Sequence, residues 1–122
     1  MLAEVAKYHP SALQVGLTPG VIHSVRLEIG KFGVKQKLPI AFCADPYQYV
    51  FPGVLFAYGT ANAVVFRRVA AFVDRILKGA RPGDLPVDQV ETVDFHVNLR
   101  TAKALGLTIP QPVPYRADRV LE

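Results

Sequence analysis

Two stretches of the chain repeat apolar residues at the spacing of an amphipathic helix. In residues 21–34 the apolar positions fall every three or four residues, at Ile22, Val25, Ile29 and Phe32. This pattern predicts a helix with one buried side.

The second helical stretch is longer and reads VVFRRVAAFVDRILKG over residues 64–79. Its apolar positions form one continuous stripe, at Val65, Val69, Phe72, Val73 and Ile76. Thr60 is suited to cap the start of this helix, and Gly79 is suited to end it. We therefore expect a helix that lies half buried on another element.

Three short, uncharged runs at residues 12–17, 39–42 and 53–58 favour buried strands of a parallel sheet. A short helix over residues 2–8 precedes them, and an irregular segment with the turn signal Asp45-Pro46 fills residues 43–52. Such alternation predicts an α/β fold in three layers, with a short, mostly parallel sheet and flanking helices.

After a proline-spaced crossover at residues 80–89, Val93, Phe95 and Val97 alternate with polar residues. This period of two predicts an edge strand, or one packed on one side only, with Asp94, His96 and Asn98 facing water. Asn98 is expected to cap a short helix over Leu99–Leu105.

Prolines at 110, 112 and 114 predict an extended tail. We expect a single domain overall, with an α/β lobe core over residues 1–79. Residues 80–122 would then supply the crossover, edge strand, short helix and tail.

Composition excludes several classes of protein. The chain is 51% hydrophobic, as expected for a globular fold, and its 14 basic and 10 acidic residues give a net charge of +4. That charge is spread along the chain, which disfavours nucleic-acid binding. Its single cysteine, Cys43, cannot form an internal disulfide and is expected to be a small buried hydrophobe. No membrane span or export signal is evident, which by itself indicates a cytoplasmic protein.

The sequence contains no recognisable catalytic motif, and we expect no enzymatic activity and no cofactor. His9, His23 and His96 lack metal-ligand spacing, so we interpret them as surface or capping residues and expect no metal site.

Candidate ligand-binding residues follow the three predicted parallel strands, where doubly wound folds bind ligands. A helix start near residue 21 offers N–H groups to a carboxylate, Asp45 offers a partner for an ammonium group, and tyrosines offer stacking surfaces. Together they suit an amino-acid zwitterion. The candidates are Thr18, Gly20, His23, Ser24, Asp45, Tyr47, Tyr58, Gly59 and Thr60. In the alternative, Asp45 is only a turn residue and the tyrosines only pack.

The segments FRRVAAFVDRILKGARPGDLPVDQ and NLRTAKALGLTIP resemble the C-terminal part of ABC-transporter substrate-binding proteins related to tryptophan/tyrosine-binding receptors. The resemblance implies a type I periplasmic-binding fold, two lobes enclosing an amino-acid-like solute, and an extracytoplasmic location. Ala57 and Thr60 stand where the family often has serine and proline. An ABC permease would be a partner in the full-length context, and this chain would be a fragment or truncated homologue.

Two alternatives remain open at this stage. The chain could be a stand-alone cytoplasmic α/β interaction module, or a small enzyme using Asp45 and His23. Because its strand face at residues 93–98 would lack a covering lobe, we also expect a homodimer or a domain-swapped assembly.

Overall fold

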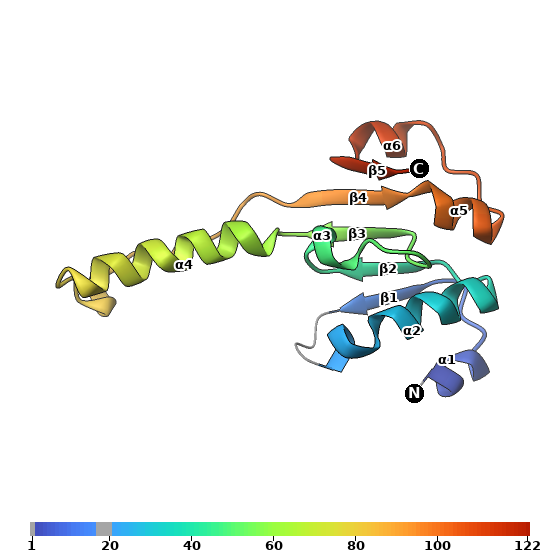
Figure 1. Cartoon of the computed structure of the whole chain (residues 1–122), viewed down its shortest axis with the longest axis horizontal. Helices are drawn as coiled ribbons and strands as arrows, with labels where there is room; N and C mark the ends of the chain where they lie inside the picture. Colours follow the sequence, from blue (N-terminus) through green and yellow to red (C-terminus); the bar gives the residue numbers. More distant parts are fainter. Residues whose placement is uncertain (1, 17–20) are drawn as a thin grey trace.

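The structure is a computed structural model that describes residues 2–16 and 21–122. One sheet with flanking helices forms the body, and a long arm projects from it (Figure 1). The strands are β1 (Leu13–Gly16), β2 (Ile40–Cys43), β3 (Phe56–Gly59), β4 (Asp94–Asn98) and β5 (Arg119–Leu121). The helices are α1 (Leu2–Lys7), α2 (Val21–Gln36), α3 (Pro46–Tyr49), α4 (Asn62–Leu77), α5 (Leu99–Leu105) and α6 (Pro112–Arg116), with a 3₁₀ turn, η1, at Pro82–Asp84.

The five strands lie in the sheet in the same order as in the sequence. β1, β2 and β3 run parallel, β4 is antiparallel to β3, and β5 is parallel to β4. The predicted fold class, α/β with a mostly parallel sheet and flanking helices, is confirmed.

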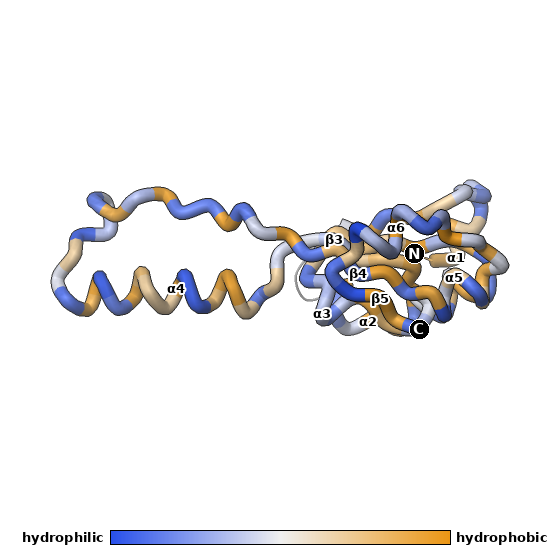
Figure 2. Tube along the Cα trace, turned by 90° about the horizontal axis from the view of Figure 1, so that it is seen from above, coloured by the Kyte–Doolittle hydropathy of each residue, from blue (hydrophilic) through white to orange (hydrophobic). Residues whose placement is uncertain are grey.

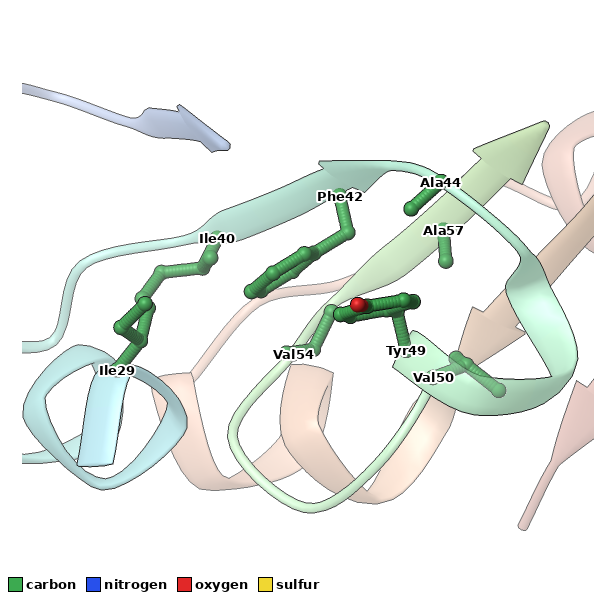
Figure 3. Close-up of a cluster of buried hydrophobic side chains, with 8 residues drawn as sticks. All are labelled: Ile29, Ile40, Phe42, Ala44, Tyr49, Val50, Val54 and Ala57. Carbon is green, nitrogen blue, oxygen red and sulfur yellow. The ribbon is translucent and has the colours of Figure 1, made fainter. Parts of the chain in front are cut away.

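One face of the sheet carries the hydrophobic core. Ile40 and Phe42 of β2 pack with Ala57 of β3 against Ile29 of α2 (Figure 3). The ring of Tyr49, from α3, stacks on that of Phe42 with centroids 5.2 Å apart. The apolar periodicity of residues 21–34 therefore predicted the contact side of α2 correctly.

The opposite face over β1, β2, β3 and the start of β4 remains open to solvent. Register places Val97, the partner of Phe56, on this face as well, but it is 1% exposed. We call the remaining six side chains the open face: Gln14, Ala41, Cys43, Phe56, Tyr58 and Phe95. Cys43 is exposed, so its expected burial was wrong. The rings of Phe56 and Tyr58 both make edge contacts with Phe95, and they are 37% and 48% exposed. β1, at the sheet edge, is only half buried on its core side, although its apolar run predicted a buried strand.

Strand β4 corrects two expectations. It lies between β3 and β5, so it is not an edge strand. Its polar residues point to the covered face: His96 and Asn98 are 0% and 2% exposed. The buried amide of Asn98 is satisfied by hydrogen bonds: its Oδ1 accepts from Thr101 N at 3.0 Å and its Nδ2 donates to Phe51 O at 3.3 Å. The predicted cap of α5 is thus confirmed.

Two segments expected to be irregular or extended are ordered. Residues 46–49 form α3, because the Asp45 carboxylate caps its first turn and Pro46 occupies an early helical position. The tail contains α6, which begins at Pro112, and β5. Early proline is compatible with a helix start, which explains why proline spacing misled the prediction.

Helix α4 exists as predicted, but it is not packed on the body. It runs clear of the sheet with none of its residues fully buried, and its apolar positions are visible along it (Figure 2). The residue at its N-cap is Ala61, which makes no side-chain cap bond, so the expected cap by Thr60 was wrong. Gly79 has φ +100° just past the helix end, as predicted.

The loop before β3 packs against α2 through two glycines. Gly53 has φ +94°, and a Cβ placed on it would lie 2.2 Å from Gly30 O. Such a distance is far below van der Waals contact, so this crossing depends on the absence of both side chains.

We predict that Gly53→Ala lowers the free energy of unfolding by about 2–5 kcal/mol, since it combines backbone strain with a steric clash. Gly83→Ala is the matched control, because a Cβ there meets nothing within 4 Å. Urea unfolding of both variants measures the difference. Equal stability of the two variants would contradict the proposed contact.

Candidate functional site

The loops that follow β2 and β3, together with the start of α2, make up the candidate site. The predicted residues Thr18 and Gly20 lie outside the described part of the chain. The remaining candidates fall on three elements: α2, the β2–α3 junction and the end of β3.

Asp45 is the best-anchored candidate, with only 6% of its surface exposed. Its Oδ1 accepts from Tyr47 N at 3.0 Å. Its Oδ2 accepts from Gln48 Nε2 and from Asn62 N, each at 3.1 Å. One carboxylate therefore caps α3 and also satisfies a backbone N–H in the first turn of α4.

Gly59 allows β3 to lie tight against the β2–α3 junction. A Cβ at Gly59 would lie 2.5 Å from Ala44 O, and Ala44 N donates to Tyr58 O at 3.0 Å. This contact holds the end of β3 beside Asp45, so the two loops form one continuous surface.

Tyr47 covers a buried histidine. Its ring, 57% exposed, meets the His96 ring edge-on with centroids 4.5 Å apart. Neither ring nitrogen of His96 has a hydrogen-bond partner among the described residues. The expectation of a surface or capping histidine was wrong here, because the alternation of β4 gives two faces without saying which one is covered.

Burial lowers the pKa of His96, because the charged ring would lose its hydration. Asp94 opposes this shift and Arg119 adds to it. The Pro46 carbonyl also favours the charged ring, although it does not reach hydrogen-bond geometry. The folded protein therefore favours a neutral His96.

His23 and Ser24 lie in the first turn of α2, where both are exposed. The Tyr49 hydroxyl lies 3.4 Å from His23 Nδ1, and the two rings meet edge-on at 6.1 Å. Through Tyr49, which belongs to the same short helix as Tyr47, His23 is linked to the β2–α3 junction.

The last two candidates lie elsewhere. Tyr58 belongs to the open face, on the opposite side of the sheet from the core. Thr60 lies at the base of the arm, where its Oγ1 donates to Thr92 O at 3.1 Å and joins the outgoing and returning chains. The structure therefore brings Asp45, Tyr47 and Gly59 together.

Tyr49 and His96, which lie buried beneath this surface, were missed by the sequence analysis. The sequence around Tyr49 did not indicate its position, because aromatic residues at alternate positions from 47 to 51 fit a loop as well as a helix. No group of three or more potential metal ligands occurs in the described residues. No helix there is long and apolar enough to cross a membrane.

A model of the family described as "ABC transporter substrate binding protein" matches residues 9–121. The match spans nearly the whole chain, so the chain belongs to this family. The resemblance inferred from residues 66–110 is thereby confirmed. No curated protein matches.

Solved structures with a similar fold support this family assignment. An ABC domain from Streptococcus pneumoniae in complex with L-Trp is 26% identical, with a TM-score of 0.81, and the match covers 96% of this chain and 40% of that one. A conserved domain protein from Vibrio cholerae is 25% identical with a TM-score of 0.80, covering 98% and 39%. A ligand-free, open substrate-binding protein with adhesive properties from Clostridium difficile, 22% identical with a TM-score of 0.62 and coverage of 99% and 41%, shares the fold. This chain thus spans about 40% of the length of each.

We predict that Asp45→Ala destabilises the protein by about 1–3 kcal/mol, because it leaves donors of two helices without an acceptor. Asp84→Ala, at an exposed acidic residue of η1, is the matched control and should change stability by less than about 0.5 kcal/mol. Chemical denaturation followed by circular dichroism measures both. A neutral Asp45→Ala would show that its capping bonds contribute little.

The lowered pKa of His96 predicts a pH-dependent stability. Above pH about 6.5, the ordinary pKa of histidine, the His96 ring is neutral in both the folded and the unfolded state. As pH falls below that value, the unfolded chain takes up a proton that the folded chain resists, so the free energy of unfolding decreases. His96→Leu should flatten this dependence between pH 7.5 and 5.5 without loss of stability at pH 7.5, since the ring nitrogens are unpaired.

Urea unfolding at several pH values measures that dependence. The control is His9→Asn, which alters an exposed residue and should leave the slope of wild type. An unchanged slope in His96→Leu would mean that other groups set the pH response.

Proposed function

We propose that the chain forms one wall of the binding site for a small, amino-acid-like solute in an ABC-transporter receptor. The observation that carries this proposal is the family match over residues 9–121. The L-Trp complex of the Streptococcus pneumoniae relative supports an amino acid as the solute class.

The surface around α3 has chemistry suited to such a solute. The exposed Tyr47 ring offers a face for an apolar or aromatic side chain, and its position is fixed by its backbone bond to Asp45. The first turn of α2, which carries His23 and Ser24, lies beside α3 through the His23–Tyr49 contact and supplies positive dipole charge for a carboxylate.

Asp45 has a positioning role in this proposal. Three donors of the chain already occupy its carboxylate, and 94% of its surface is covered, since 6% is exposed. The solute ammonium group would therefore be recognised mainly by groups outside this wall.

Binding by one wall alone should be weak, because most of the affinity of a closing receptor comes from enclosing the ligand. We extend the proposal to the whole receptor: an extracytoplasmic location and an ABC permease as partner. Both rest on the family, since this chain spans about 40% of its solved relatives.

The test uses L-Trp as probe. The chain contains no tryptophan, so indole fluorescence reports the ligand alone in equilibrium dialysis or anisotropy. We expect a dissociation constant of about 1 mM, which corresponds to about −4 kcal/mol. Tyr47→Ala should weaken binding about five-fold through the loss of one aromatic contact.

The matched control is Tyr115→Ala, at a tyrosine of α6 that is 85% exposed and distant in sequence from the site. It should bind like wild type. Equal loss in both variants would contradict the assigned wall, and absence of binding at several times the expected constant would contradict the solute class for this chain. Glycine and L-tyrosine, tested in parallel, separate side-chain recognition from zwitterion recognition.

A further inference from the structure

The arm carries an apolar stripe that nothing in the described chain covers. We call the arm residues 61–93, and the bare stripe is the set of exposed apolar residues on α4. Their exposed fractions run from 40% to 82%, for Phe66, Val69, Val73, Ile76 and Leu77. An isolated amphipathic helix is only marginally stable in water, because its apolar side normally supplies the stabilising contacts.

The returning chain packs on a different flank of α4. Arg68 forms an ion pair with Asp88 and donates to Gln89 O at 3.2 Å. A hollow of about 300 Å³ separates that flank from residues 86–88, with Phe72 in its lining. The bare stripe is therefore not buried by the return of the chain, and it remains available to another molecule.

The open face of the sheet is the second uncovered apolar surface. Parallel strands are normally covered on both faces, yet Phe56, Tyr58 and Phe95 form an aromatic patch at the surface. The arm leads away from the sheet (Figure 1), so the bare stripe does not cover the open face of its own chain.

The total accessible surface of the chain indicates how much of it a second molecule could cover. A compact monomer of 13.4 kDa should expose about 6,500 Å² by the scaling of surface with mass. This chain exposes 8507 Å², an excess of about 2,000 Å². A standard interface buries about 800 Å² per partner and obligate interfaces bury more, so the excess suffices for a stable dimer.

We propose that two copies of this chain associate with two-fold symmetry, the bare stripe of each covering the open face of the other. The 16 residues of α4 span about 24 Å, and five strands span about 19 Å from first to last, so one helix can cross the whole sheet. Each chain supplies one stripe and one face, which makes the pair self-complementary.

A second copy is the occupant that needs no further component. Both surfaces occur in equal number in every molecule, and the polar flank of α4, with Arg67 and Lys78, stays in solvent. The assembly does not use the solute-binding wall around Tyr47. Failure of the dimer proposal would therefore leave the proposed solute binding intact. Failure of solute binding would likewise leave the dimer proposal intact.

The first experiment is light scattering coupled to size-exclusion chromatography of the purified chain at micromolar concentration. We expect twice the chain mass of 13.4 kDa. Val69→Asp with Val73→Asp should return the mass to one chain, because two charges would be buried at the interface. Both residues are exposed in the single chain, so the fold should persist, which circular dichroism checks. Arg67→Asp, on the solvent side of the same helix, is the matched control and should remain dimeric.

Cross-linking identifies the surfaces. The native Cys43 lies exposed on the open face, so a cysteine on the stripe can form a disulfide with it across the interface. Cysteine is introduced singly as Val69→Cys, Val73→Cys and Ile76→Cys. At least one should give a dimer linked between the new cysteine and Cys43 under mild oxidation, identified by peptide mass spectrometry.

Three results would overturn the proposal. They are a single-chain mass for wild type, a dimer unaffected by the paired aspartates, and a Cys43–Cys43 link as the main product, which indicates face-to-face packing. With a single-chain mass, the bare stripe and the open face would have no partner in a second copy of this chain.

Discussion

The carboxylate of Asp45 is the interaction on which the arrangement of the site depends. It closes the first turn of α3, holds the side chain of Gln48, and accepts from the backbone of Asn62 at the start of α4. Because it is buried, each of these bonds is made without competition from water. The direction in which the arm leaves the body and the position of the Tyr47 ring therefore have one common cause. A solute that bound against Tyr47 would contact the same short segment from which the arm is anchored.

Burial is uneven between the two faces of the sheet. The covered face holds an apolar core with polar side chains at its margin, where Asn98 is satisfied and His96 is not. The open face holds aromatic residues that a complete α/β protein would bury. This imbalance agrees with the match to about 40% of each solved relative. The chain thus has a hydrophobic core of its own together with apolar surfaces that its described residues leave uncovered.

Local patterns in the sequence predicted elements well and their surroundings poorly. The spacing in residues 21–34 and 64–79 gave α2 and α4, and Asn98 and Gly79 marked helix ends, because these signals depend on near neighbours. The alternation in β4 showed two faces, but the packing of α3, distant in sequence, decides that the face of His96 is the covered one. Likewise, the stripe of α4 predicted a contact that the described part of the chain does not provide. In the site, Asp45 was found from its turn signal, whereas Tyr49 and His96 join it only through folding.

The antiparallel pairing of β3 with β4 has a consequence for how this fold can change. Gly59 and Asp94 are partners in the ladder, so the two strands are adjacent where the arm begins and ends. In topological terms the whole arm is the loop of a β-hairpin. A tight turn could replace it without altering any strand pairing, and its length could vary without disturbing the core. The sheet and the arm are thus separable modules, free to diversify at different rates.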